Sequence, residues 1–100
     1  MSEVGLHIRD KGNGRPLVLI HGWSCPGQLF QGQIDCLHSE ARCLVPDLPG
    51  HGKTGNRIPL TIEAAAEALH AELVTREIFD AVVCGWSMGA LVAYAMIERF

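Results

Sequence analysis

The chain has 100 residues, of which 48% are hydrophobic and 19% are charged, and its net charge at pH 7 is −3. This length and composition are typical of one small globular domain. The mildly acidic balance argues against nucleic-acid and anionic-membrane partners, because those partners bind basic surfaces. The uncharged stretch 81–97 is shorter than the roughly 20 residues that a membrane-spanning helix needs. We therefore expect no nucleic acid and no membrane among the partners.

The N-terminus and the cysteines bear on the cellular compartment. Residues 1–7 lack the basic and then apolar pattern of a secretion signal. The four cysteines form no C-x-x-C pair and have no metal-ligand spacing. We therefore predict a cytoplasmic protein with reduced thiols, no bound metal and no cofactor.

Two strands are predicted near the N-terminus. Residues 4–9 alternate modestly between apolar and polar side chains. The run 16–20 is apolar and β-branched, which is typical of a parallel strand covered on both faces. Between them, the Asn13-Gly14 step favours a β-hairpin, so the first strand is expected to be antiparallel.

The second strand ends in His21-Gly22-Trp23. Glycine at 22 lets the main chain approach a ligand closely. For His21 we favour a structural role over a catalytic one, with the imidazole hydrogen-bonded to neighbouring loop backbone. Trp23 is expected to form part of a pocket wall, the alternative being a partly buried loop anchor.

A helix and a third strand follow. Apolar residues recur at spacings of three and four, which predicts a helix over about 28–38. The strand at 43–46 runs into a Pro- and Gly-rich turn that begins with Asp47. Aspartate after a strand commonly accepts backbone hydrogen bonds in the turn, and this is the role expected of Asp47.

The segment 50–55 has the G-x-G-x-x-G spacing of dinucleotide-binding loops. That fingerprint requires a helix that opens directly from the glycines, whereas Asn56, Arg57 and Pro59 follow here. We therefore reject nucleotide binding and interpret the segment as a flexible loop.

The second half of the chain predicts a helix, a strand and another helix. Thr61 can cap the first of these helices, whose apolar positions share one face. The apolar run 81–84 predicts the strand, with Cys84 as a small buried residue. The apolar segment after it predicts a helix over 88–100.

Between that strand and that helix stands Gly85-Trp86-Ser87-Met88-Gly89. A strand, one sharp turn and a helix, with serine at the apex, is the context of a G-x-S-x-G nucleophile elbow. Glycine is needed at 85 and 89 because a side chain at either position would collide with the neighbouring strand or helix. The turn presents the Ser87 hydroxyl at a helix N-terminus, where backbone N–H groups favour a developing oxyanion. We therefore predict Ser87 as a catalytic nucleophile.

Three segments, in this order and spacing, resemble the front part of the α/β-hydrolase fold: 21–23, 47–52 and 85–89. Around Ser87 and Trp23 the sequence is similar to the pimeloyl carrier-protein methyl ester esterases and related small-ester esterases. Serine-type haloperoxidases resemble it almost as well. The resemblance implies an α/β fold with a doubly wound, mostly parallel sheet that is truncated after the helix following Ser87. Residues 1–100 would then be the N-terminal portion of a single α/β-hydrolase domain.

The resemblance also implies site roles. The backbone N–H groups of Trp23 and Met88 would form the oxyanion hole, and Trp23 and Trp86 would contact the substrate. In this family the acid and the histidine of the triad follow the serine, so both are expected beyond residue 100. Of the histidines present, only His51 is predicted at the same rim of the sheet, and we do not expect it to act as the base.

The function predicted on this basis is hydrolysis of carboxylic esters by a serine, through an acyl-enzyme. The substrate would be a small-molecule ester or a carrier-bound acyl group. Perhydrolysis, thioester cleavage or carbon–carbon bond hydrolysis on the same fold is one alternative. A short non-catalytic chain that binds a small ligand or a partner is another.

Overall fold

The computed structural model describes residues 5–24, 27–56 and 58–100. Within these residues a four-stranded sheet has the order β1-β3-β2-β4. β1 is antiparallel to β3, whereas β2 is parallel to both β3 and β4. The elements are β1 (Ile8–Lys11), β2 (Arg15–Ile20), η1 (Gly27–Phe30), α1 (Gln31–Leu37), β3 (Ala41–Pro46), α2 (Ile62–Thr75), β4 (Val82–Gly85) and α3 (Met88–Arg99). The predicted α/β class with a mostly parallel sheet is confirmed.

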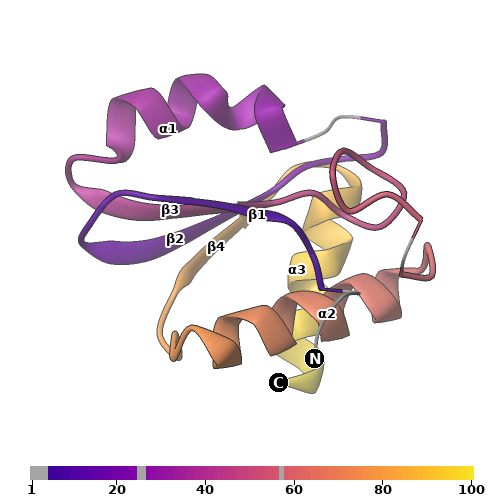
Figure 1. Ribbon diagram of the computed structural model, residues 1–100. Helices are drawn as coiled ribbons and strands as arrows, with labels where there is room; N and C mark the ends of the chain where they lie inside the picture. The colour runs from indigo at the N-terminus through magenta and orange to yellow at the C-terminus, as the bar shows by residue number, and fades with distance from the viewer. Residues whose placement is uncertain (1–4, 25–26, 57) are drawn as a thin grey trace.

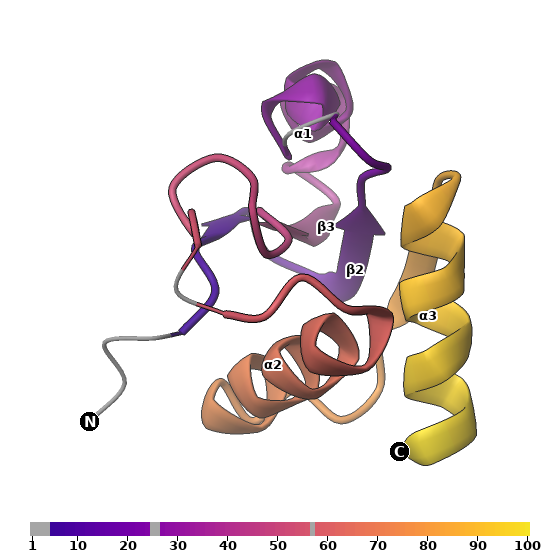
Figure 2. The same cartoon turned by 90° about the vertical axis from the view of Figure 1, so that its right-hand side faces the viewer.

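Helices cover both faces of the sheet. α1 lies over one face, and α2 and α3 lie side by side against the other (Figures 1 and 2). Side chains of β2 alternate between these layers, so Val18 and Ile20 join the core beneath α2 and α3 while Leu19 joins the smaller core beneath α1. Both faces of β2 are therefore buried, as its uninterrupted apolar sequence predicted.

The predicted hairpin between the first two strands is wrong. β1 is antiparallel, but its partner is β3, which lies between β1 and β2. The reason is burial: after Arg15, β2 is apolar and occupies the interior of the sheet, whereas β1 carries charged residues at 9–11 and lies at an edge. The connection 12–14 passes the start of β3 instead, where the Asn13 N–H is 3.4 Å from the His38 carbonyl oxygen.

The prediction that Cys84 is buried is also wrong. β4 pairs only with β2 among the described strands, so it forms an edge of the sheet. Cys84 lies opposite Leu19, on the α1 side of the sheet, but α1 packs against β3 and leaves Cys84 exposed. The helix expected over 28–38 is present with one difference, since its first turn, η1, is a 3₁₀ helix.

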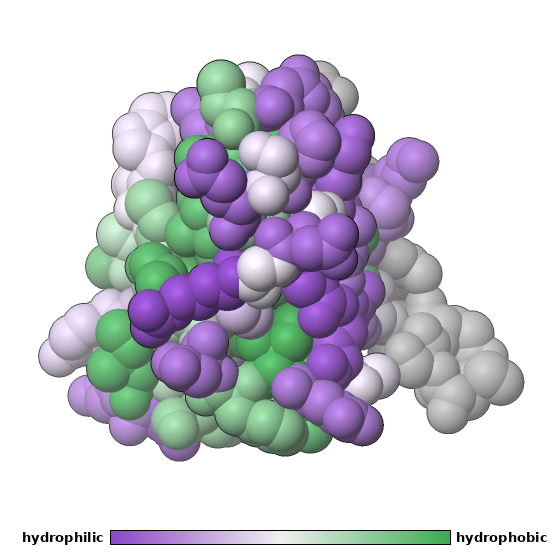
Figure 3. Space-filling model, turned by 90° about the vertical axis from the view of Figure 1, so that its left-hand side faces the viewer, coloured by the Kyte–Doolittle hydropathy of each residue, from purple (hydrophilic) through white to green (hydrophobic). Residues whose placement is uncertain are grey.

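The parallel strands begin at the end of the sheet that Figure 3 shows, and hydrophilic residues occupy the middle of that surface. At this end Asp10 forms ion pairs with Arg42 at 2.7 Å and with Arg76 at 3.2 Å. The polar loops that concern function lie at the opposite end, where β2, β3 and β4 finish. None of the helices in the described part of the chain combines the length and hydropathy that crossing a membrane requires.

Candidate active site

Ser87 stands at a sharp bend between β4 and α3. Its backbone has φ 58° and ψ −120°, a left-handed conformation that side chains disfavour. Hydrogen bonds hold the bend closed: the N–H groups of Gly89 and Ala90 donate to the carbonyl oxygens of Trp86 and Ser87, both at 2.9 Å. Ser87 is exposed to solvent. The turn therefore presents a hydroxyl at the N-terminus of α3, with a backbone that the surrounding structure must hold in place.

Three glycines let the main chain close around this bend. A Cβ on Gly85 would overlap the Gly89 carbonyl group, and a Cβ on Gly89 would overlap the carbonyl oxygen of Ile20. A Cβ on Gly22 would lie 3.1 Å from the Cβ of Ser87. The loop after β2 thus packs directly against the serine, and the Trp86 N–H joins the two strands by donating to the Ile20 carbonyl oxygen at 3.0 Å.

His21 connects the loops that follow β2 and β3. It is fully buried. Its Nε2 accepts a hydrogen bond from the Leu48 N–H at 2.9 Å, so Nδ1 carries the proton and donates to the Gly22 carbonyl oxygen at 2.7 Å. Burial lowers the pKa of His21, which keeps the ring neutral. With both nitrogens used, the imidazole fixes the shape of the two loops.

His51 holds the same two loops from the other side. Its Nε2 accepts from the Ser24 N–H at 2.8 Å, and its Nδ1 lies 3.0 Å from the Pro49 carbonyl oxygen. The ring lies edge-on to its neighbours, with centroids 4.7 Å from His21 and 5.3 Å from Trp23. Because loop backbone uses both nitrogens of His51, neither is available to Ser87 in this arrangement.

Asp47 anchors the turn after β3. The Lys53 N–H donates to its Oδ2 at 3.1 Å, and Arg9 of β1 donates from Nη1 to its Oδ1 at 3.0 Å. The Thr54 hydroxyl donates to the Asp47 carbonyl oxygen at 2.6 Å. The carboxylate is fully buried, so the hydrogen bonds from Lys53 and Arg9 replace water that it has lost. They also tie the segment 50–55, expected to be a flexible loop, back onto the end of β3.

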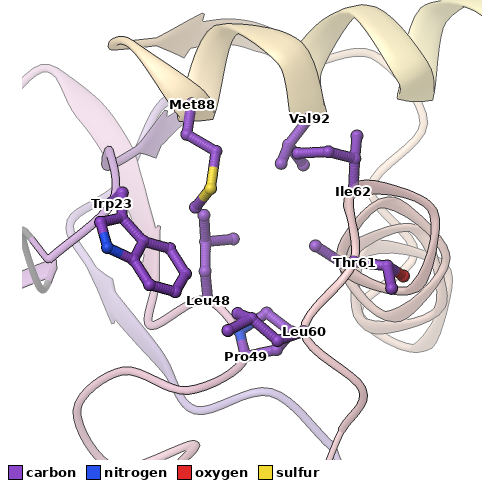
Figure 4. A pocket seen from close by; sticks show the side chains of 9 residues that line it. Trp23, Leu48, Pro49, Leu60, Thr61, Ile62, Met88 and Val92 are labelled. Atoms are coloured by element: carbon purple, nitrogen blue, oxygen red, sulfur yellow. The ribbon is translucent and has the colours of Figure 1, made fainter.

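A cavity of about 220 Å³ opens beside the bend, between α2, α3 and the two loops. Trp23 forms part of its wall, and the side chains of Met88 and Val92 reach it from α3 (Figure 4). Trp86 is not among the residues that line this cavity. It is half exposed and lies against the loop after β2, where a Cβ on Gly22 would be 3.3 Å from its Cε3. The lining residues are Trp23, Leu48, Pro49, Leu60, Thr61, Ile62, Ala65, Met88 and Val92.

These loops bring together residues from three distant parts of the chain. The chain itself matches a known protein family. The model of the alpha/beta hydrolase family aligns with residues 17–99. The chain belongs to this family. In this chain the serine bend follows the carboxyl end of β4.

Individual proteins and solved structures are also similar to this chain. A pimeloyl-[acyl-carrier protein] methyl ester esterase from Aromatoleum aromaticum is 45% identical over 87 residues, which cover 87% of this chain and 33% of that protein. The N-acyl homoserine lactonase AidH, solved with N-butanoyl homoserine, superposes with a TM-score of 0.88 at 37% identity, covering 95% of this chain and 37% of the other. A thermophilic esterase from Thermogutta terrifontis gives a TM-score of 0.87 at 34% identity, covering 94% and 35%. The chain thus spans about a third of the length of the relatives it matches.

Two features of this alpha/beta hydrolase site were not predicted from the sequence. One is the ion pair between Arg9 and Asp47. These residues are 38 positions apart, so no local sequence pattern predicts their contact. The other is the role of His51 in holding the loop at Ser24. Across residues 5–24, 27–56 and 58–100, no three His, Cys, Asp or Glu side chains gather where they could bind a metal ion.

Proposed function

We propose that Ser87 is the nucleophile of a serine esterase, and that residues 1–100 are the N-terminal portion of its single hydrolase domain. The observation that carries the proposal is the left-handed backbone of an exposed serine at the N-terminus of α3. Such strain persists only where the surroundings impose it, and it is concentrated at functional sites. The named activities of the relatives, on a methyl ester and on a lactone, are consistent with ester chemistry.

In the proposed reaction the Ser87 oxygen attacks the carbonyl carbon of a carboxylic ester. The carbonyl electrons move to oxygen, and the backbone N–H groups of Met88 and Trp23 donate hydrogen bonds to that oxyanion. Met88 suits this role because the first N–H groups of a helix have no partner within the helix. In the best-known case, one such donor contributes about 2.7–4 kcal/mol to transition-state stabilisation.

The oxyanion then collapses and expels the alcohol, leaving an ester between the acyl group and Ser87. Water attacks this acyl-enzyme, releases the acid and restores the hydroxyl. Both steps need a base that first takes the serine proton, gives it to the leaving alcohol and later activates the water. His21 and His51 use both of their ring nitrogens in holding loops. We therefore assign the base, and the acid that orients it, to the part of the hydrolase domain beyond residue 100.

The substrate class follows from the same site. A carboxylic ester, free or carried on an acyl carrier, presents the carbonyl that this mechanism needs, with Trp23 and Trp86 beside the reacting group. Both indoles are about half exposed, at 56% and 53%, so each offers an apolar face to a ligand. No metal or cofactor enters the proposed steps.

The experiment is active-site labelling of the complete gene product with a fluorophosphonate. The Ser87 oxygen would form a bond to phosphorus as the phosphorus–fluorine bond breaks and fluoride leaves. We expect a single adduct, located at Ser87 by mass spectrometry, and its loss in Ser87→Ala. A matched control is Ser39→Ala, which removes another exposed serine, in the turn after α1. An adduct at other serines, or labelling no faster than in unfolded protein, would overturn the proposal.

A further inference from the structure

Resting on the proposed esterase function, we propose that the cavity beside Met88 holds the acyl chain of the substrate, and that Leu60 sets the chain length accepted. The ligand inferred is an unbranched aliphatic acyl group. Four observations carry the proposal: the chemistry of the wall, the closed floor, the position of Leu60 and the volume.

The wall of the cavity is almost entirely hydrocarbon. In Figure 4, Leu48 lies on one side of it, and Ile62 and Val92 lie next to each other on the other side. The one side-chain hydroxyl in the wall belongs to Thr61, and its oxygen caps α2 by accepting the Ala64 N–H at 3.0 Å. A polar or charged chain would lose its water here and meet few polar groups in return, whereas an aliphatic chain gains from leaving water.

The cavity has a floor and a rim. Ala65 and Val92, at 3% and 1% exposure, close its inner end between α2 and α3. Trp23 and Leu60 line it while remaining about half exposed, so they form the rim. A closed space suits the part of the ester that stays bound to Ser87 through both steps. The alcohol must leave before water attacks, so it belongs on the open side.

Leu60 rests on the backbone of Gly50. A Cβ on Gly50 would lie 3.2 Å from Leu60 Cδ1, and Gly50 has φ +82°, which favours glycine. The Leu60 side chain is therefore supported from below while its other side faces solvent. A larger residue at 60 would reduce the volume, and a smaller one would open the rim.

The volume sets the expected chain length. If each methylene takes about the volume of one water, ~30 Å³, the cavity of about 220 Å³ holds a chain of about seven carbon atoms. Up to that length, each additional methylene buried in the cavity should raise kcat/KM about fourfold, the equivalent of about 0.8 kcal/mol.

The test measures kcat/KM of the complete gene product with p-nitrophenyl esters from acetate to dodecanoate. We expect the rate to rise to an optimum near seven or eight carbons and then to fall. Leu60→Trp should move the optimum to shorter chains and lower the hexanoate-to-acetate ratio by at least about tenfold. Leu60→Ala should move the optimum to longer chains. The matched control is Leu37→Trp, a partly exposed leucine of α1 across the sheet, which should leave the profile as it is.

Two further measurements separate the possible failures. If n-alkyl acetates, with the chain on the alcohol, respond to Leu60→Trp while the acyl series does not, the acyl assignment is overturned. Binding of hexanoate to Ser87→Ala is followed by NMR at the methyl groups of Ile62, Ala65 and Val92, and Leu60→Trp should weaken it at least about tenfold. Binding without hydrolysis of any ester would refute the esterase and leave the cavity assignment standing. Hydrolysis with a chain-length profile that Leu60 does not change would refute the cavity assignment alone.

Discussion

Gly22 lies directly against Ser87, with only 3.1 Å between the position of a Cβ on Gly22 and the Cβ of the serine. The same Cβ would also be 3.2 Å from the Trp86 carbonyl oxygen, which belongs to the bend. Gly22→Ala should therefore push the bend away from the loop after β2. We expect kcat/KM to fall more than about tenfold, because small displacements of a nucleophile are costly. Stability should fall by about 1–3 kcal/mol through overpacking.

The matched control for that substitution is Gly32→Ala. Gly32 lies in α1, and a Cβ there would meet no atom within 4 Å. Alanine is the better helix former by about 0.5–1 kcal/mol, so this variant should be slightly more stable and equally active. Steady-state kinetics and urea unfolding of both variants check the pair. Equal activity in Gly22→Ala and wild type would contradict the close contact.

The strain at Ser87 can be measured by comparing two inactive variants. Ser87→Ala keeps a Cβ in the left-handed conformation, whereas Ser87→Gly removes it. We expect the glycine variant to be more stable than the alanine variant by at least about 1 kcal/mol. Thermal unfolding of the two proteins under one condition provides the comparison. Identical melting temperatures would mean that the bend is not strained by its side chain.

The buried carboxylate of Asp47 depends on Arg9. The two are 3.0 Å apart, and the Asp47 side chain is fully buried while that of Arg9 is 26% exposed. Arg9→Met should cost about 2 kcal/mol, somewhat less than the loss of a partner in a fully buried pair. The control is Arg15→Met, since Arg15 meets Asp80 only at 3.7 Å and both side chains are largely exposed. That control should unfold like the wild type in urea; a similar loss in both variants would contradict the burial argument.

The neutral state of His21 predicts a pH dependence of stability. Burial is the main cause of its lowered pKa; nearby His51 and Arg9 lower it further, while the Gly22 hydrogen bond and Asp47 oppose the shift. Below the ordinary pKa of 6.5 the unfolded chain takes up a proton at this position before the folded protein does. The free energy of unfolding should therefore be fully present above pH 6.5 and decrease below it, by up to about 1.4 kcal/mol per pH unit.

The variant for this measurement is His21→Gln, which keeps an acceptor for the Leu48 N–H but does not titrate. Urea unfolding at pH 7.5 and at pH 5.5 gives the two slopes. Histidines that do not contact His21 contribute equally to both proteins, so their effect cancels in the difference. A slope in His21→Gln as steep as in the wild type would show that His21 is not the group responsible.

The 100-residue chain by itself should associate in solution. Among the described strands β4 has one unpaired edge, and the apolar side chains of Phe79, Val82 and Ile97 nearby are 79%, 45% and 75% exposed. An open strand edge beside apolar surface is a template for pairing between chains. Sizing chromatography should show oligomers, and a sharp monomer peak with cooperative melting would exclude this behaviour.

Local sequence signals predicted much of this structure. The apolar runs of β2 and β4, the cap at Thr61 and the glycines around Ser87 each act within a few residues, so a short window contains the whole signal. Thr61 does accept the Ala64 N–H at 3.0 Å, as its place before an apolar helical pattern predicted. The structure of such elements is determined by residues close to them in the sequence.

The features that failed or were missed depend on distant partners. The Asn13-Gly14 step favours a hairpin locally, but burial of β2 places β3 between the two strands. Cys84 has the sequence context of a core residue, and only the position of β4 at an edge exposes it. The cavity draws its walls from four segments, none of which marks it alone.

The backbone of Ser87 carries a cost in stability that a glycine at the same position would avoid. For stability alone, glycine would be the better residue at that bend, because glycine accepts φ 58° without penalty. Stability alone does not explain a serine at this position, which agrees with the proposed role of Ser87 as a nucleophile.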